Sequence, residues 1–432
     1  MDARELAPGS RVALLVPGSV AYAELVIALL RHGVFPVPMD VKLTPSEREA
    51  LLADLDPALV VDSEQQLADL HEQLGHELGA EPDGPPRGRP IHLTSGTTGR
   101  PKGVFSGLLD RADAEALLAE ERDLWGFGPD DVNLVLGPLH HSAPLRFAMG
   151  TLLAGGRVVV PGPFEPGTVT AAIREHRPTS MFCVPAHLQR LFVHWDEHGT
   201  PDLTCFRLVA HAGAPCPEWV KRRLVEEFPD DATWEFYGST EGQFTACRSE
   251  EWLERPGTLG RARPGRTMTA DEDGHLWCAV PRHARFSYLS DPAKTAQAWR
   301  DTEAGPAFTV GDLGRVDEDG YVFLDGRRED LIITGGVNVY PAEVERVLGE
   351  VAGVEDIAVF GVDDERWGQR VCAAVVGPVR EDTLRAHARE HLAPAKRPKD
   401  YHRLDTLPRT ATGKVRRLDL PEAVNALLKG PG

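Results

Sequence analysis

The sequence predicts an α/β fold with more than one domain. Its 432 residues exceed the size of one ordinary core, so two or three domains are expected. In the first part of the chain, short apolar runs typical of strands alternate with stretches typical of helices, which indicates parallel sheets covered by helices. From about residue 248 to 325 the strands become short and Gly, Pro and Asp turns more frequent, which predicts a smaller β-rich subdomain.

The first elements alternate between strand and helix. Residues 12–16 form an apolar run typical of a strand, and residues 19–31 predict a helix that begins at a capping serine and stops before a glycine. A second strand is expected around residue 37. A capping box at residues 44–47, with proline at the first helical position, begins a second helix. Residues 59–61 then predict a third strand, which completes a parallel strand–helix–strand–helix–strand unit.

Later segments continue this alternation. Residues 132–137 and 158–160 predict strands, the second of them buried, and residues 170–173 are expected to open a helix. Further strands are predicted at 181–184 and 208–209.

The last hundred residues predict a compact α+β segment. Their expected elements are a hairpin at 335–336, helices at 341–348 and 382–391, and strands at 357–360 and 371–376.

Composition excludes several classes of function. The net charge is −19, from 47 basic and 66 acidic residues, which argues against a nucleic-acid or anionic-membrane surface. No apolar run approaches the roughly 20 residues that span a bilayer. The six cysteines contain no C-x-x-C pair, so we expect reduced thiols and a cytoplasmic location rather than disulfides or a zinc site.

One run of residues indicates phosphate chemistry. Residues 94–103 read Thr-Ser-Gly-Thr-Thr-Gly-Arg-Pro-Lys-Gly, with three glycines, four hydroxyl side chains and a lysine. Glycines let the backbone approach a ligand, consecutive N–H groups can cradle anionic oxygens, and Lys102 adds positive charge. The run is not a Walker A loop, because Pro101 stands in the place of that motif's second glycine. A polar surface turn is the alternative.

Three more motifs follow in order along the chain. They are Tyr237-Gly238-Ser239-Thr240-Glu241, then Gly311-Asp312 with Asp325-Gly326-Arg327, then Pro408 to Lys414. Together with the loop, they resemble the signatures of the adenylate-forming superfamily, of the acyl- and aryl-CoA synthetase type. The resemblance implies a large N-terminal domain over residues 1–325. It also implies a small, mobile α+β lid domain over residues 326–432.

The resemblance also implies roles for named residues around ATP. The loop would bind the β- and γ-phosphates through Thr94, Ser95, Gly96, Thr97, Thr98, Gly99 and Lys102. Thr240 and Glu241 would bind phosphate oxygen and Mg²⁺, a hard cation that prefers oxygen ligands. The alternative for this pair is a capped helix N-terminus.

Other residues would surround the base and the ribose. The adenine would lie against Tyr237, Gly238 and Ser239 and against the segment Gly213, Ala214 and Pro215, whose small residues permit close approach. Asp312 and Arg327 would contact the ribose. One departure from the pattern is Val310, where threonine is usual.

The remaining implied roles concern the reacting groups. Lys414 would bridge the acid's carboxylate and the α-phosphate, and His141 would neighbour that carboxylate, although a buried structural histidine is a serious alternative. Gly335 and Gly336 would leave room for the pantetheine arm of coenzyme A. Trp367 would stack on the adenine of coenzyme A, or else lie in an ordinary surface turn.

These roles predict an ATP-dependent acid–CoA ligase. It would join a carboxylic acid to AMP, release pyrophosphate, and transfer the acyl group to coenzyme A. The expected acid is apolar or aromatic, both from the resemblance and because the acyl-pocket segments lack an obvious carboxylate-binding arginine cluster. The acceptor stays open: a carrier-protein thiol or a nitrogen nucleophile, nitrite included, is the alternative. A third reading is a nucleotide-binding protein without turnover.

The N-terminus also departs from the family pattern. The phosphate loop begins earlier in the chain than is usual, so the N-terminus is expected to be shortened. This leaves the oligomeric state open, a homodimer included.

Overall fold

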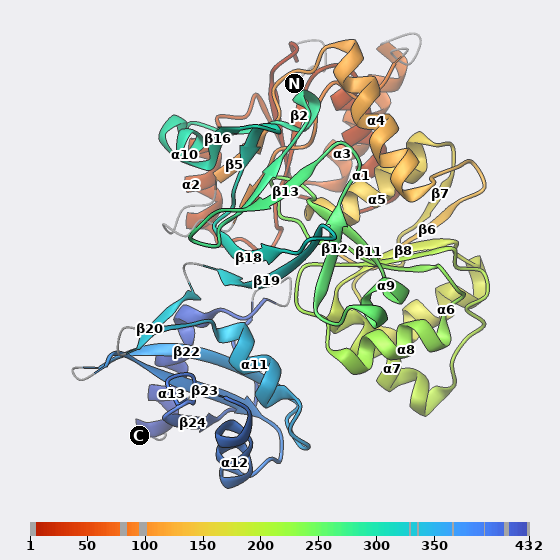
Figure 1. The fold of residues 1–432 in the computed structure, drawn as a ribbon. Helices are drawn as coiled ribbons and strands as arrows, with labels where there is room; N and C mark the ends of the chain where they lie inside the picture. The colour runs from red at the N-terminus through yellow and green to blue at the C-terminus, as the bar shows by residue number, and fades with distance from the viewer. Residues whose placement is uncertain are drawn as a thin grey trace. The chain divides into compact units, whose positions relative to one another are not determined.

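The chain folds into two compact units. The computed structural model describes residues 6–77, 84–94, 102–327, 330–334, 337–364, 367–392, 394–409 and 414–429. The first unit contains residues 1–268 and 278–308, and the second contains residues 269–277 and 309–432 (Figure 1). The predicted β-rich region is therefore divided between the two units. The proposed domain boundary after residue 325 falls inside the second unit and stays a prediction.

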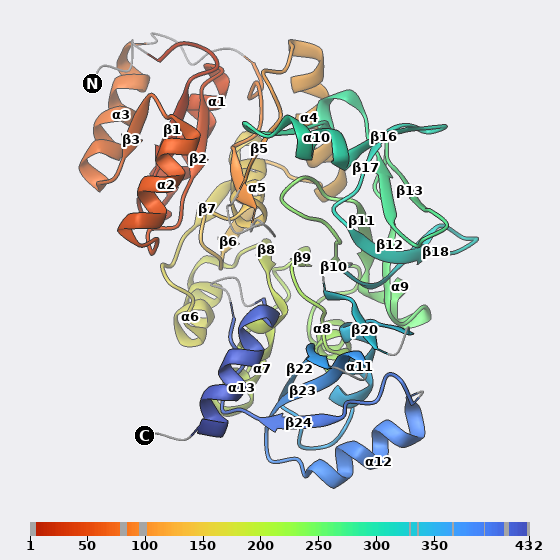
Figure 2. The same cartoon turned by 90° about the vertical axis from the view of Figure 1, so that its left-hand side faces the viewer.

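The first unit begins with a three-stranded parallel sheet of order β2-β1-β3. Figure 2 shows its strands side by side, with helices around them. The helix caps expected from the sequence are confirmed: Ser19 Oγ accepts a hydrogen bond from the N–H of Tyr22, and Thr44 and Glu47 form the reciprocal capping box. The elements are β1 (Arg11–Leu14), α1 (Val20–Arg31), β2 (Phe35–Pro38), α2 (Pro45–Leu55), β3 (Leu59–Val61) and α3 (Glu64–Glu77).

A larger sheet forms the centre of the first unit. Its strands run in the order β7-β6-β8-β9-β10-β11-β12; the pairs from β7 to β10 are parallel, and β11 and β12 are antiparallel. The strands are β6 (Val132–Val135), β7 (Arg157–Val159), β8 (Ser180–Cys183), β9 (Leu208–His211), β10 (Thr233–Glu235), β11 (Thr245–Arg248) and β12 (Thr258–Ala262).

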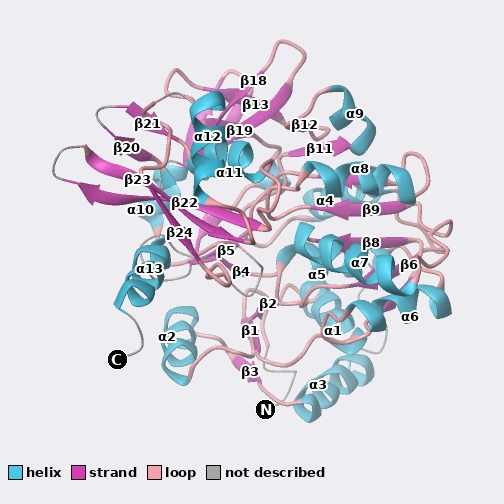
Figure 3. Cartoon of the chain, turned by 90° about the horizontal axis from the view of Figure 1, so that it is seen from below, coloured by secondary structure: helices cyan, strands magenta, loops and turns pink. Residues whose placement is uncertain are grey.

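Helices cover both faces of this sheet. One apolar cluster joins β6, β8 and β9 to α6, α7 and α8, and another joins the sheet to α4 and α5 (Figure 3). The helices are α4 (Arg111–Trp125), α5 (Ser142–Leu153), α6 (Pro166–His176), α7 (Pro185–His198), α8 (Glu218–Glu227) and α9 (Ser249–Glu254). The α/β prediction is confirmed.

Two details of the prediction were wrong. The strand expected to be buried near residue 158 is β7, the edge of the sheet, and its residues are exposed or half-buried because only β6 pairs with it. The helix expected to open at 170–173 begins at Pro166, because the Glu165 side chain accepts a hydrogen bond from the N–H of Thr168 and caps it there.

Smaller antiparallel sheets follow in the first unit, although residues 269–270 of β13 and 276–277 of β14 belong to the second. One has the order β15-β5-β4, and in another β17 pairs with both β14 and β16. The elements are β4 (His92–Thr94), β5 (Lys102–Phe105), β13 (Thr267–Ala270), β14 (Leu276–Ala279), β15 (Ser287–Tyr288), α10 (Pro292–Ala298), β16 (Trp299–Thr302) and β17 (Gly305–Phe308).

The second unit is α+β, as predicted. Its sheet has the order β21-β20-β23-β22, and β24 pairs in parallel with β23; a separate hairpin is formed by β18 and β19. Helices α11 and α12 pack on one apolar cluster, and α13 packs on another. The elements are β18 (Asp312–Val316), β19 (Tyr321–Arg327), β20 (Ile332–Thr334), β21 (Val337–Val339), α11 (Pro341–Gly349), β22 (Asp356–Asp364), β23 (Gly368–Val376), α12 (Glu381–His391), β24 (Asp400–Arg403) and α13 (Leu420–Lys429).

The two Asp-Gly turns of the second unit are also confirmed, since Gly274 donates to the carbonyl of Asp271 and Gly320 to that of Asp317. Within the described residues, no helix has the length and apolar character needed to cross a membrane.

Candidate active site

The motif at residues 237–241 forms a tight hairpin turn between β10 and β11. Gly238 bridges Gln243, the N–H of Ser239 donates to the carbonyl of Gly242 at 2.8 Å, and the N–H of Glu241 donates to Ser239 Oγ at 3.2 Å. Tyr237 is buried, and its ring lies 4.7 Å from that of Phe244. The alternative of a capped helix N-terminus is therefore excluded.

Glu241 is a buried carboxylate in this turn, with a relative exposure of 6%. Its Oε1 accepts a hydrogen bond from the hydroxyl of Tyr288 at 2.7 Å, and no basic side chain of the described residues forms an ion pair with it. Burial, and then the charge of Glu241, raise the pKa of Tyr288, so the hydroxyl stays protonated and donates. A buried anion without a positive partner suits a bound cation, and oxygen ligands suit Mg²⁺.

The phosphate-loop motif begins and ends on paired strands. Thr94 of β4 lies opposite Lys102 of β5, and the N–H of Lys102 lies 3.4 Å from Thr94 Oγ1. Lys102 Nζ lies 3.5 Å from Asp291 Oδ2, so this carboxylate partly balances its charge. The central residues of the motif lie outside the described residues; they are Ser95, Gly96, Thr97, Thr98 and Gly99.

Two predicted segments lie at the carboxyl ends of parallel strands, where ligands bind in sheets of this type. His141 follows β6 and occupies the N-cap position of α5, and its ring lies 4.1 Å from that of His140. The segment of Gly213, Ala214 and Pro215 follows β9; Gly213 has a φ of 93°, and Gly213 and Pro215 are exposed. Burial lowers the pKa of His140, which favours the neutral imidazole.

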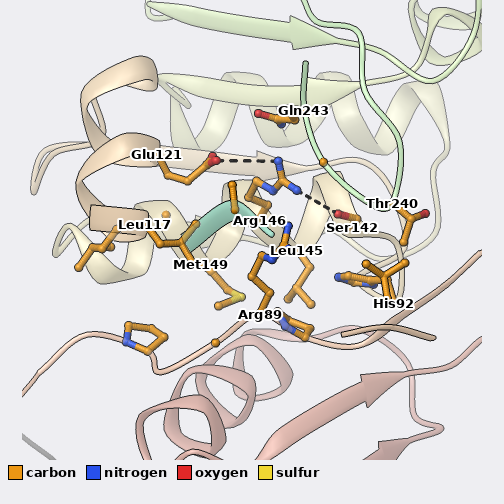
Figure 4. A pocket seen from close by; sticks show the side chains of 18 of the residues that line it. Arg89, His92, Leu117, Glu121, Ser142, Leu145, Arg146, Met149, Thr240 and Gln243 are labelled. Carbon is orange, nitrogen blue, oxygen red and sulfur yellow. Dashed lines mark hydrogen bonds and ion pairs between the residues drawn. The ribbon is translucent and has the colours of Figure 1, made fainter. Parts of the chain in front are cut away.

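A cavity lies in the first unit beside the 237–241 turn. It encloses about 1040 Å³ of space, part of it open to solvent, and Thr240 and His92 belong to its wall. Figure 4 shows Arg146 in the middle of this wall, with Leu117 and Met149 to one side and Thr240 and His92 to the other. An apolar lining with a few polar groups is typical of sites that bind small organic molecules.

Charged side chains also line the cavity. Three of them are arginines, Arg89, Arg146 and Arg266, and Glu121 accompanies them. The predicted acyl-pocket segments contribute none of these arginines, which converge on the cavity from other parts of the chain.

The remaining predicted residues belong to the second unit. Asp312 is 3% exposed on β18 and lies opposite Arg327 on β19, whose side chain is outside the described residues. Trp367 is 38% exposed, with Lys399 Nζ 5.7 Å from its ring centre, and Lys414 is exposed. Gly335 and Gly336 lie outside the described residues, between β20 and β21, which pair as the predicted hairpin.

Sequence reasoning missed Tyr288, the donor to Glu241, and the arginines of the cavity. Tyr288 carried no signal, because 47 residues separate it from Glu241 in the chain. Arg146 did carry one: it is the only charged residue of α5, a mostly apolar helix, and a lone charge in such a helix usually has a buried partner or a ligand.

Comparisons with known proteins agree with this geometry. The family described as AMP-binding enzyme matches residues 1–279, and the AMP-binding enzyme C-terminal domain matches residues 343–414. Feruloyl-CoA synthase of Amycolatopsis sp is 34% identical over 94% of this chain and 87% of its own length. Indoleacetate–CoA ligase of Aromatoleum aromaticum is 32% identical over 98% of this chain and 90% of its own length.

A solved structure supports the same assignment. The o-succinylbenzoate CoA synthetase MenE from Bacillus subtilis, in complex with its acyl-adenylate intermediate, superposes with a TM-score of 0.79. It is 26% identical, and the match covers 97% of this chain and 89% of that one. The chain therefore belongs to the AMP-binding enzyme family, the adenylate-forming superfamily, and within it to the acyl-CoA synthetase type.

Proposed function

We propose that this protein is an ATP-dependent acid–CoA ligase that acts on a carboxylic acid with an apolar or aromatic body. A carboxylate oxygen of the acid attacks the α-phosphorus of ATP, the bond to the β-phosphate breaks, and pyrophosphate leaves. The sulfur of coenzyme A, after losing its proton, then attacks the acyl carbon, and AMP leaves with the bonding electrons. Both steps depend on positioning and on neutralisation of charge.

The observation that carries the proposal is the 237–241 turn. It places a buried carboxylate that has no positive partner among the described residues, that of Glu241, next to Thr240, which lines the cavity of the first unit. Mg²⁺, when bound, would neutralise phosphate charge. Glu241 would be its ligand, with Tyr288 orienting the carboxylate through the 2.7 Å hydrogen bond.

The other roles follow from membership of the family and are part of the proposal. Thr94 and Lys102 would bind phosphate from the ends of their hairpin, and Tyr237 would line the adenine site. Asp312 and Arg327 would bind the ribose.

Further roles belong to the acyl-transfer step and to the lid. Lys414, on a mobile lid beginning near residue 326, would stabilise charge on the α-phosphate and carboxylate. His141 would lie beside the acid, and Gly335, Gly336 and Trp367 would contact coenzyme A.

The six free cysteines suit a reducing compartment such as the cytoplasm. A carrier-protein acceptor and a homodimer belong to the same set of proposals.

A panel of acids tests the proposed reaction. We expect acid-dependent release of pyrophosphate without coenzyme A, and an acyl thioester when coenzyme A is added. Pyrophosphate without thioester would exclude coenzyme A as the acceptor and favour a carrier protein or a nitrogen nucleophile. Absence of pyrophosphate with every acid would leave a binding protein without turnover.

The role of Lys414 is tested by separating the two steps. Lys414→Ala should abolish adenylate formation while transfer from preformed acyl-AMP to coenzyme A continues. Arg380→Ala is the control, because that side chain is in the same unit and 83% exposed. Equal loss of both steps in Lys414→Ala contradicts the assigned role.

A further inference from the structure

A buried network, of which Glu121 and Arg266 line the cavity, matches two arginines with two glutamates. Arg263 Nη2 lies 3.0 Å from Glu121 and 3.2 Å from Glu120, and Arg266 Nη1 lies 2.7 Å from Glu120. His283 Nε2 lies 2.7 Å from the other oxygen of Glu120. Burial raises the pKa of Glu120, but His283 and the two arginines outweigh it and hold the pKa at about 2. The negative charges of both glutamates are therefore already balanced within this network.

Two further arginines of the cavity have no carboxylate of their own. Arg89 donates from Nη1 to the carbonyl of Glu241 and from Nη2 to the carbonyl of Arg285, both neutral groups. Arg146 Nη1 lies 3.9 Å from Glu121, a glutamate that Arg263 contacts more closely, and its Nη2 lies 3.4 Å from Ser142 Oγ. Across the described part of the chain, no other carboxylate lies within ion-pair distance of either side chain.

The unmatched charge is substantially buried. The Arg146 side chain is 19% exposed and that of Glu121 is 15% exposed. Burial is the main cause that lowers the pKa of Arg89 to about 10; the charges of Arg146 and Arg266 add to it, and those of Glu120 and Glu121 oppose it. A buried charge without a counter-charge is costly, and an anionic ligand in the cavity would remove that cost.

The rest of the wall is suited to hydrocarbon. Apolar side chains come from α4, α5 and β17, among them Leu117, Leu145, Met149 and Phe308. Burial lowers the pKa of His92, at the Thr240 end of the cavity, to about 3, so its imidazole is neutral and adds no charge. The fitting ligand therefore combines an apolar body with an anionic group.

The carboxylate that reacts is a poor partner for these arginines. It loses its charge when it becomes a mixed anhydride, so an arginine pair that held it would again be unmatched. Such a pair would also stabilise the substrate more than the transition state, which slows the chemical step. Neither objection applies to a carboxylate that keeps its charge throughout the reaction. Figure 4 places Thr240, the candidate catalytic residue, to one side of Arg146, so the two can serve different ends of one molecule.

We propose that the cavity binds the acid substrate and that Arg146 and Arg89 bind a second, non-reacting carboxylate, so that the substrates are dicarboxylic acids with an apolar body. This inference rests on the proposed ligase activity. Arg146 is then the residue that determines specificity for the distal carboxylate.

Matched pairs of acids test the inference. The pairs are hexanoate with adipate, octanoate with suberate, and phenylacetate with 1,4-phenylenediacetate, and the readout is kcat/KM for pyrophosphate release by the full chain. We expect the diacid of at least one pair to exceed its monoacid by about tenfold or more, the contribution of a hydrogen-bonded charge pair. Arg146→Gln should lower kcat/KM for that diacid by about tenfold to a hundredfold and leave the monoacid within about twofold.

Two further variants and a binding measurement complete the test. Arg146→Lys, which keeps the charge, should retain part of the preference for the diacid. Arg122→Gln on α4, at a side chain that is 55% exposed, should change neither acid. Calorimetric titration of the preferred diacid without ATP should show binding to the unaltered protein and to Arg122→Gln, and loss of binding to Arg146→Gln.

The outcomes separate this inference from the proposed function. Equal turnover of monoacids and diacids overturns the inference while the ligase activity stands, and so does an Arg146→Gln variant that impairs both acids equally. Absence of pyrophosphate release with every acid overturns the ligase activity, and the substrate class with it.

Discussion

Two neighbouring ion pairs of α8 allow the effect of burial on stability to be measured. Lys221 Nζ lies 2.8 Å from Glu235 Oε2, with side chains that are 1% and 6% exposed. Arg222 Nη2 lies 2.6 Å from Glu218 Oε1, with side chains that are 56% and 59% exposed. The N···O distances are similar and the basic residues adjacent, but the first pair is buried and joins α8 to β10, whereas the second is exposed and lies within α8.

We predict that Lys221→Met destabilises the first unit by about 3–5 kcal/mol, because it leaves the Glu235 carboxylate buried without its cation. Methionine keeps the apolar stem, so little packing is lost. Arg222→Met should cost less than about 0.5 kcal/mol, the usual contribution of an exposed pair spaced four residues apart on a helix.

The assay is urea-induced unfolding followed by circular dichroism and tryptophan fluorescence, with the free energy of unfolding compared between variants. Adding Glu235→Gln to Lys221→Met should recover part of the loss, since a neutral amide is less costly to bury than a carboxylate. If Lys221→Met and Arg222→Met cost the same, burial does not control the strength of these pairs and the reasoning is refuted.

Three further predictions concern the site and its support. Tyr288→Phe removes the hydrogen bond to Glu241, and we expect the Mg²⁺ concentration needed for pyrophosphate release to rise about tenfold to a hundredfold. The partners of Glu120 lower its pKa to about 2, so the charged carboxylate stabilises the folded protein fully above the unfolded-state pKa, and this stabilisation is lost as the pH falls through about 5 to 2. In urea unfolding, Glu120→Gln should therefore remove up to about 3 kcal/mol of the pH dependence of the free energy of unfolding. Gly260→Ala should destabilise by more than about 2 kcal/mol in the same assay, because a Cβ there would lie 2.2 Å from the carbonyl oxygen of Ala246.

Matched controls separate these effects from general disruption. Tyr22→Phe removes a buried hydroxyl that has no hydrogen-bond partner among the described residues, and it should leave the Mg²⁺ requirement unchanged. Gly257→Ala, at a φ of 87° with no atom within 4 Å of the new Cβ, should cost only about 1 kcal/mol. The first prediction is contradicted if Tyr288→Phe leaves the Mg²⁺ requirement unchanged, and the second if Glu120→Gln leaves the pH dependence of stability unchanged. The third is contradicted if the two glycine substitutions destabilise the protein equally.

Local chemistry made much of the fold predictable. The caps at Ser19 and Thr44 and the Asp-Gly turns at 271–274 and 317–320 depend on residues close together in the chain, and the structure confirms all four. Errors arose where non-local packing decides the outcome. The strand near residue 158 looked buried because its residues are apolar, yet its place at the edge of the sheet leaves it half-exposed.

The family and the kind of chemistry were determined by the sequence, because phosphate-binding turns are built from contiguous residues whose backbone and hydroxyl groups act together. The environment of the site was decided only by the tertiary structure. Glu241 obtains its donor from Tyr288, and Arg146 faces Glu121 across α4 and α5, through contacts between segments far apart in the chain. Charge balance in a buried cavity is a sum over such distant segments, so an excess of arginine there is not visible in a linear sequence.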